Sequence, residues 1–209
     1  MKKVFETVVR ILCDIRPDKI VDGAYLFAQT KDNERSVFTA AQNITNDFLA
    51  RRIMLLDKSA SNGFGGFKAW KRQLLGAGIK EEMIAGVTLE NSVEHNTLTE
   101  SRAVIRFAKI NNFKTIIVTA ASFHQVRAFM TVVKVALEEY PDLRIFSHPG
   151  VALPWNEKVA HSQGALRARR LEFNESELKR IKKYHRKGDL CSFETVIEYL
   201  DKRDGMSSI

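Results

Sequence analysis

The stretch KTIIVTA, residues 114–120, runs directly into ASFHQVRAFMTVVKVALEE, residues 121–139. The first segment is rich in β-branched and apolar side chains, which is typical of a buried strand. The second repeats apolar side chains at helical spacing, so we predict a strand over 114–120 and a helix over 123–139. A strand that passes straight into a long helix is the basic unit of an α/β fold with parallel strands.

The same alternation continues on both sides of this unit. We predict helices over 2–15, 36–51, 67–75 and 98–111, and strands over 20–27, 53–56, 84–89 and 143–146. Strands that are joined by long helical crossovers pair in parallel, and such crossovers are right-handed. The predicted fold class is therefore α/β, a Rossmann-like three-layer sandwich with a mainly parallel sheet of about five strands and additional C-terminal helices.

The pattern changes after residue 150, where we predict helices only. Asn174 and Glu177 have the spacing of a capping pair that opens a helix ending before Gly188, and Ser192 opens another that runs to about Arg203. The length of 209 residues fits one domain with a substantial core. We expect a single domain over 1–209, with a Rossmann-like core over 1–150 and a helical extension over 151–209 packed on it.

Composition excludes several classes of protein. Hydrophobic residues make up 44% of the chain and charged residues 28%, which is ordinary for a globular domain and excludes a disordered or fibrous chain. No apolar run approaches the roughly 20 residues that span a bilayer. Glu6 and Arg10 interrupt the apolar segment that a signal peptide would need. Cys13 and Cys191 have no partners at metal-ligand spacing, so we expect no metal site and a cytoplasmic location.

The formal net charge of +8 raises the possibility of an anionic partner. Much of the excess lies between Arg167 and Lys187, where nine basic residues stand against three glutamates. A run of this kind is usually a solvated helix face. Nucleic-acid binding through these basic C-terminal helices is the alternative.

The loops that follow the strands are the places to look for a site, because ligands of open parallel sheets bind beyond the carboxyl ends of the strands. Ser122 and Gln125 fit a capping pattern at the start of the helix over 123–139. His124 and Arg127 fall in its first turns, where the helix dipole makes an added cation unfavourable by about 0.3–1 kcal/mol. Their positions make sense if an anion binds there. A structural histidine and a surface arginine are the alternative.

Two further loops carry candidates. Glu90 follows the third predicted strand, where its carboxylate could orient His124 or take a proton. Thr97 and Glu100 fit a capping box, and we expect His95 to be exposed.

The loop SASNGFGG, residues 59–66, has glycines that permit positive φ and close approach to a ligand, although a simple turn explains them as well. It is not a P-loop, and no dinucleotide fingerprint follows the first strand.

Residues 18–150 resemble the YdcF-like family, which includes the bacterial SanA and ElyC proteins. The resemblance rests on the first strand after Asp18, the glycine loop after the second strand, Glu90 with Ser92, Asn96 with Thr97 and Glu100, and above all residues 122–128, SFHQVRA. The chain departs from the family at residues 22–29, DGAYLFAQ, where the family usually has a glycine cluster.

The resemblance implies a Rossmann-like fold with a polar cleft and a nucleotide-like ligand such as S-adenosylmethionine. We therefore expect a small anionic, phosphate-bearing or nucleotide-like molecule at the C-terminal edge of the sheet, bound by a hydrolase or group transferase. A non-catalytic sensor that uses the same cleft is the alternative. The expected catalytic residues are His124 and Glu90, and the expected ligand-binding residues are Arg127, Ser122, Gly65, Gly66, Asn96, Thr97 and Glu100.

Overall fold

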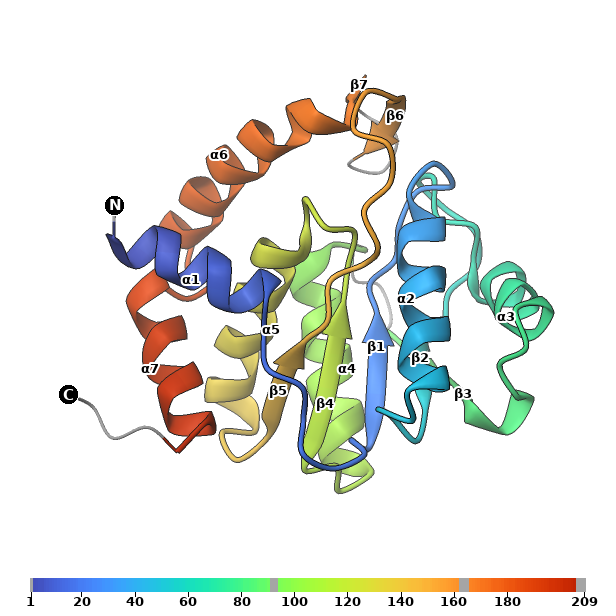
Figure 1. The fold of residues 1–209 in the computed structure, drawn as a ribbon, viewed down its shortest axis with the longest axis horizontal. Coiled ribbons are helices and arrows are strands. Elements are labelled where there is room, and N and C mark those ends of the chain that lie inside the picture. The colour runs from blue at the N-terminus through green and yellow to red at the C-terminus, as the bar shows by residue number, and fades with distance from the viewer. Residues whose placement is uncertain (1, 91–93, 162–165, 206–209) are drawn as a thin grey trace.

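A parallel sheet forms the centre of the protein. The computed structural model describes residues 2–90, 94–161 and 166–205, and within them the sheet has the strand order β3-β2-β1-β4-β5. Every adjacent pair in this sheet is parallel. The predicted α/β class and Rossmann-like layering are therefore confirmed (Figure 1). The strands are β1 (Gly23–Leu26), β2 (Ile53–Leu56), β3 (Ile84–Val87), β4 (Thr115–Thr119) and β5 (Arg144–Ser147).

Helices cover both faces of the sheet. Helices α2 and α3 pack on one face, and α4 and α5 pack on the other, where α1 and α7 add a further layer against α5. Figure 1 shows α1 and α7 beside each other at the left of the sheet. Their bounds are α1 (Lys2–Leu12), α2 (Glu34–Asn46), α3 (Phe67–Gly76), α4 (Thr97–Ile110) and α5 (Gln125–Glu139), with a 3₁₀ turn η1 (Glu81–Met83) before β3.

The alternation of side chains along β1 explains how one short strand serves two cores. Ala24 and Leu26 belong to the apolar cluster under α2 and α3, whereas Tyr25 and Phe27 belong to the cluster under α4 and α5. Successive side chains of a strand point to opposite faces, so a strand buried on both faces is apolar throughout. This accounts for the continuous apolar runs from which the strands were predicted.

The region after residue 150 differs from the prediction of helices only. Strands β6 (Lys158–His161) and β7 (Leu166–Arg169) form an antiparallel hairpin, followed by a 3₁₀ turn, η2 (Arg170–Glu172). Each strand has only four residues and one is largely exposed, so neither displays a recognisable period. The two predicted helices are present as α6 (Phe173–Arg186) and α7 (Phe193–Arg203). In Figure 1, the hairpin and α6 lie beyond the carboxyl ends of the strands.

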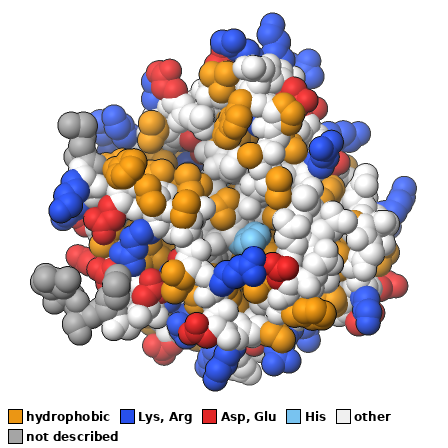
Figure 2. Space-filling view, viewed as in Figure 1, with side chains coloured by type: hydrophobic (Ala, Val, Ile, Leu, Met, Phe, Trp, Pro, Cys, Tyr) orange, Lys and Arg blue, Asp and Glu red, His pale blue; other side chains and the backbone are white. Residues whose placement is uncertain are grey.

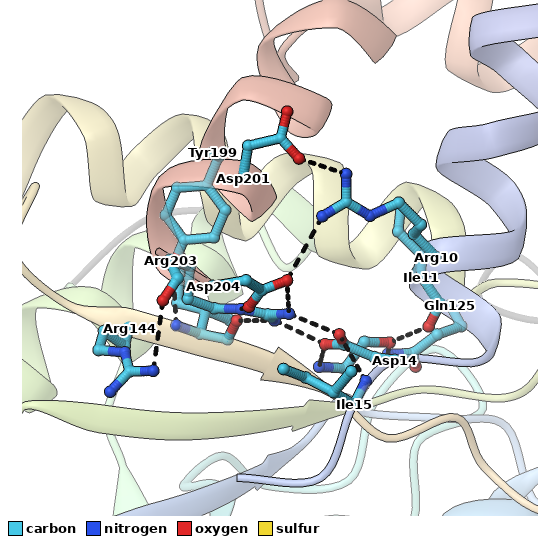
Figure 3. Close-up of polar contacts among 12 residues, drawn as sticks. Arg10, Ile11, Asp14, Ile15, Gln125, Arg144, Tyr199, Asp201, Arg203 and Asp204 are labelled. Carbon is cyan, nitrogen blue, oxygen red and sulfur yellow. Dashed lines mark hydrogen bonds and ion pairs between the residues drawn. The ribbon is translucent and has the colours of Figure 1, made fainter. Parts of the chain in front are cut away.

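Buried ion pairs join the two ends of the chain (Figure 3). The Arg203 guanidinium of α7 donates to both carboxylate oxygens of Asp14, just after α1, at 2.7 and 2.6 Å. It also donates to Asp204 and to the backbone carbonyl of Ile145 in β5. Asp14 in turn accepts from the backbone N–H of Ser147. These contacts attach α1 and α7 to the edge strand of the sheet.

The excess of positive charge is spread out on the face that Figure 2 shows, where Lys and Arg side chains are scattered among acidic ones. On α6, Lys179 pairs with Glu175, and Lys183 and Lys187 lie over the ring of Tyr184. Lys179 is thus compensated by a neighbouring acid, whereas Lys183 and Lys187 contact an aromatic ring.

Candidate ligand-binding site

A cavity of about 550 Å³ lies at the carboxyl edge of the sheet. Its walls come from the segments that follow β1, β2, β3 and β4, and from α6 together with the residues after it. The chain order reverses between β1 and β4, since β2 and β3 extend the sheet on one side of β1 while β4 and β5 extend it on the other. Ligands of doubly wound sheets bind at this kind of reversal. The cavity therefore lies where this fold places a ligand.

His124 lies in the cavity wall immediately before α5. The residue is buried, and its Nε2 lies 3.4 Å from the Thr97 hydroxyl. Its Nδ1 is buried and has no hydrogen-bond partner in the part of the chain that the structure describes. Burial, and then the nearby positive charge of Arg127, hold the pKa of His124 well below its usual value. The imidazole is therefore neutral near pH 7.

Arg127 also lines the cavity, but its guanidinium is already engaged. Its Nε and Nη2 donate to the Glu177 carboxylate at 2.6 and 3.2 Å, and its Nη1 donates to Thr97 Oγ1 at 2.8 Å. Glu177 thus occupies the two guanidinium nitrogens of Arg127 that were expected to bind an anion. Because a bidentate pair fixes both side chains, Arg127 acts as a buried anchor of the site wall.

Glu177 is the residue that sequence reasoning missed. It was expected to cap a helix with Asn174, but α6 begins at Phe173 and Glu177 points inward, where it also contacts His161 Nε2 at 3.1 Å. Burial alone would raise its pKa, yet Arg127 and His161 outweigh burial and hold the pKa well below the usual range. Its spacing from the buried residues Phe173 and Ile181 was the available signal, since it places a carboxylate on the apolar face of α6.

Glu100 lines the cavity as a buried acceptor, and the capping box expected for Thr97 and Glu100 is wrong. The box is formed by Asn96 and Thr99, one position earlier in the chain. Glu100 instead accepts from the Tyr25 hydroxyl at 2.8 Å and from the Ala28 N–H at 3.0 Å.

His95 completes the surroundings of Glu100. Its Nε2 lies 2.7 Å from the carboxylate, and its side chain is buried rather than exposed as expected. Glu100 therefore links the loops after β1 and β3 at the wall of the cavity.

Glu90 does not take part in this cavity, so the prediction that it orients His124 is wrong. Its side chain is 69% exposed and forms an ion pair with Arg106 of α4. Glu90 follows β3, as predicted, but its side chain points outward to solvent. Ser92 lies outside the described residues.

The capping pattern of Ser122 and Gln125 is also wrong. Gln125 begins α5, and its side-chain amide bonds to Ala120, Val118 and Ser147, which joins β4 to β5. Ser122 is half-buried, and its hydroxyl has no hydrogen bond within the described segments. It does not line the cavity.

The glycines of the loop over 59–66 do not line the cavity, although Asn62 and Phe64 of the same loop do. Gly65 lines a neighbouring hollow that shares the walls Thr30 and Phe64 with the main cavity. Gly66 precedes α3 with φ of 84°, and a Cβ there would lie 2.6 Å from the backbone nitrogen of Ala60. Backbone geometry therefore explains Gly66.

The buried histidines give a pH prediction. Burial lowers the pKa of both His124 and His161, so the unfolded chain takes up protons at a higher pH than the folded protein. We expect the free energy of unfolding to fall as pH decreases from about 7 to about 5, by at most about 1.4 kcal/mol per pH unit for each histidine. Urea titrations across this window should show a shallower slope for His124→Gln than for the wild type. An unchanged slope in His124→Gln would contradict the assignment.

Within residues 2–90, 94–161 and 166–205, no group of three or more His, Cys, Asp or Glu side chains is arranged to hold a metal ion. None of the helices described is both long and apolar enough to cross a bilayer. The chain matches no protein-family model, and no curated protein matches it.

Proposed function

We propose that the cavity binds a small anionic molecule, phosphate-bearing or nucleotide-like, and that the protein acts on it as a hydrolase or group transferase. The observation that carries the proposal is the cavity at the carboxyl edge of the sheet, which brings the imidazole of His124 together with two cations, Arg180 and Lys187. A concave site with a few convergent polar groups is where a small ligand binds.

The charges around the cavity favour an anion of modest charge. Arg180 and Lys187 line it from α6 and the residues just after, and neither has the bidentate partner that Arg127 has. Glu94 and Asp189 also line it, so the surface is mixed in sign. A nucleotide or S-adenosylmethionine, which the resemblance to YdcF-like proteins implies, carries both acceptors and amino or hydroxyl groups and suits such a surface.

In this proposal, His124 provides the proton chemistry. Its depressed pKa keeps the resting imidazole neutral, and an anion bound against it stabilises the protonated form. The ring then passes its proton to the leaving group, while water or an acceptor hydroxyl forms the new bond to the transferred group. Arg127 and Glu177 hold the wall behind it, and Arg180 and Lys187 attract the ligand.

The ligand is expected to stabilise the folded protein. At a free concentration of one hundred times Kd it adds about 2.7 kcal/mol, which raises Tm by about 5–10 °C for a chain of this size. A thermal-shift screen with inorganic phosphate, mononucleotides and S-adenosylmethionine should give this increase. His124→Gln should abolish it, and His185→Gln should retain it.

Equal stabilisation of His124→Gln and the wild type by every active compound would refute the proposal. A turnover assay on each stabilising compound then separates an enzyme from a sensor, because a sensor never converts its ligand.

A further inference from the structure

We infer that His161 is the general base of the proposed reaction. The Glu177 carboxylate fixes the imidazole proton on Nε2 and leaves the lone pair of Nδ1 to accept a proton from the cavity. This inference rests on the proposed function for the reaction itself, whereas the orientation of the ring depends on contacts within the protein alone. His161 was not among the residues that the sequence indicated, because the hairpin that carries it was not predicted.

His161 is the last residue of β6, and it lines the cavity together with His124. The centroids of the two imidazole rings are 6.0 Å apart. Phe123 and Phe173 pack against the His161 ring, each at a centroid distance of 4.9 Å. These contacts leave 8% of the His161 side chain exposed. The two phenyl rings therefore hold the imidazole in the cavity wall.

The contact with Glu177 defines which nitrogen of His161 carries the proton. An ionised carboxylate only accepts hydrogen bonds, and Glu177 Oε1 lies 3.1 Å from His161 Nε2. Although burial opposes ionisation, Arg127 holds the pKa of Glu177 well below its usual range, so the carboxylate is charged. Nε2 therefore donates, and a neutral imidazole then has its lone pair on Nδ1.

The resting ring of His161 is neutral. Burial lowers its pKa below the usual value, even though the hydrogen bond and the charge of Glu177 raise it, and the charges of Arg127 and Arg180 lower it further. The neighbouring ring of His124 is neutral as well. A general base must be unprotonated before the reaction, so the resting state of His161 suits this role near pH 7.

Nδ1 of His161 differs from Nδ1 of His124 in being accessible. The polar atoms of the described residues that are both sealed and unpaired include the nitrogen of His124 but not that of His161. Within the described segments, no hydrogen bond uses His161 Nδ1. An unpaired atom that is not sealed retains accessible surface, and the open space that His161 borders is the cavity. A water molecule or a hydroxyl group in the cavity can therefore reach this nitrogen.

In the reaction, a water molecule or an acceptor hydroxyl transfers its proton to Nδ1 as its oxygen bonds to the phosphorus. The bond from phosphorus to the leaving oxygen breaks, and that oxygen takes up the proton of His124. His161 then carries the positive charge, which Glu177 stabilises across 3.1 Å. A carboxylate behind a catalytic histidine has this role in hydrolytic triads. Exchange with solvent afterwards returns both rings to their resting states.

The position of the ring proton can be measured without any ligand. In ¹⁵N-histidine-labelled wild-type protein at about pH 7.5, protonated and unprotonated ring nitrogens give well-separated signals. His161→Gln identifies the signals of His161 by their loss, and its amide can still donate to Glu177. His161→Asn provides the same assignment if the first variant does not fold. We expect a protonated Nε2 and an unprotonated Nδ1, and the reverse arrangement in the wild type would overturn the inference.

Hydrolysis of 4-nitrophenyl phosphate and of bis(4-nitrophenyl) phosphate tests the catalytic role. Loss of a general base lowers kcat by about 100-fold or more, so we expect this loss in His161→Gln, with KM changed by less than about twofold. The wild-type kcat/KM should fall as pH decreases below about 6.5, because His161 becomes protonated, and His161→Gln should lose this dependence. His185→Gln, at an exposed position, should keep the wild-type kcat and pH profile.

The outcomes separate this inference from the proposed function. A kcat within about twofold of the wild type in His161→Gln would contradict the role of His161 alone, because the reaction itself would persist. Hydrolysis of neither ester by the wild type would contradict the proposed reaction, whatever the position of the ring proton, and the role of the base would fall with it.

Discussion

Glu177→Ala is expected to lower the free energy of unfolding by about 3–5 kcal/mol. The side chains of Glu177 and Arg127 are 4% and 7% exposed, and the carboxylate accepts two of the guanidinium's hydrogen bonds. Removing the carboxylate leaves a largely buried cation without its counter-charge, together with His161, which loses its contact at 3.1 Å. Breaking one half of a buried pair costs far more than the pair contributes as a whole, because the remaining charge stays desolvated.

Glu175→Ala is the matched control, because this residue lies on the same helix and pairs with Lys179 at the surface. We expect it to change stability by less than about 0.5 kcal/mol. Urea titration monitored by circular dichroism measures both variants. Equal effects of the two substitutions would show that Glu177 is not a buried anchor of the site.

Arg203→Ala is expected to have a similar cost of about 3–5 kcal/mol. The guanidinium is 1% exposed and its partner Asp14 is 3% exposed, and they share two hydrogen bonds. Without Arg203, two backbone N–H groups, those of Ile15 and Ser147, still donate to Asp14, but no positive charge offsets its burial there. The loss detaches α7 and the segment after α1 from the edge of the sheet (Figure 3).

Lys202 provides the comparison, because it precedes Arg203 on α7 and is exposed. Lys202→Ala should leave the urea midpoint almost unchanged, while Arg203→Ala should move it far lower. If Arg203→Ala unfolds at the wild-type midpoint, the ion pairs at the chain ends contribute little to stability.

Much of the fold could be predicted because its strands are buried on both faces and its helices have one apolar face. The helix over 123–139 and the strand over 114–120 agree with α5 and β4 to within about two residues. These elements follow from local patterns. The β6–β7 hairpin does not, because its four-residue strands are stabilised by packing against other parts of the chain, as with Val159 beside Phe123 and Phe173.

The candidate site was predicted in part. The sequence analysis placed five of the candidate residues at one edge of the sheet, and all five line the cavity: Asn96, Thr97, Glu100, His124 and Arg127. It could not predict the partner of Arg127, since Glu177 lies 50 residues away on a helix whose position over the sheet depends on tertiary packing. Glu90 shows the opposite error. Being next to a strand end does not fix the direction of a side chain, and Glu90 finds Arg106 at the surface.

The central claim is that an anion binds beside His124 where β4 passes into α5. The most direct test is a crystal structure of the wild-type protein soaked with selenate, an electron-dense analogue of sulfate. The account predicts selenate in the cavity, beside His124 and within reach of the Arg180 and Lys187 side chains. Selenate bound only elsewhere on the protein, with the cavity beside His124 filled by water alone, would contradict it.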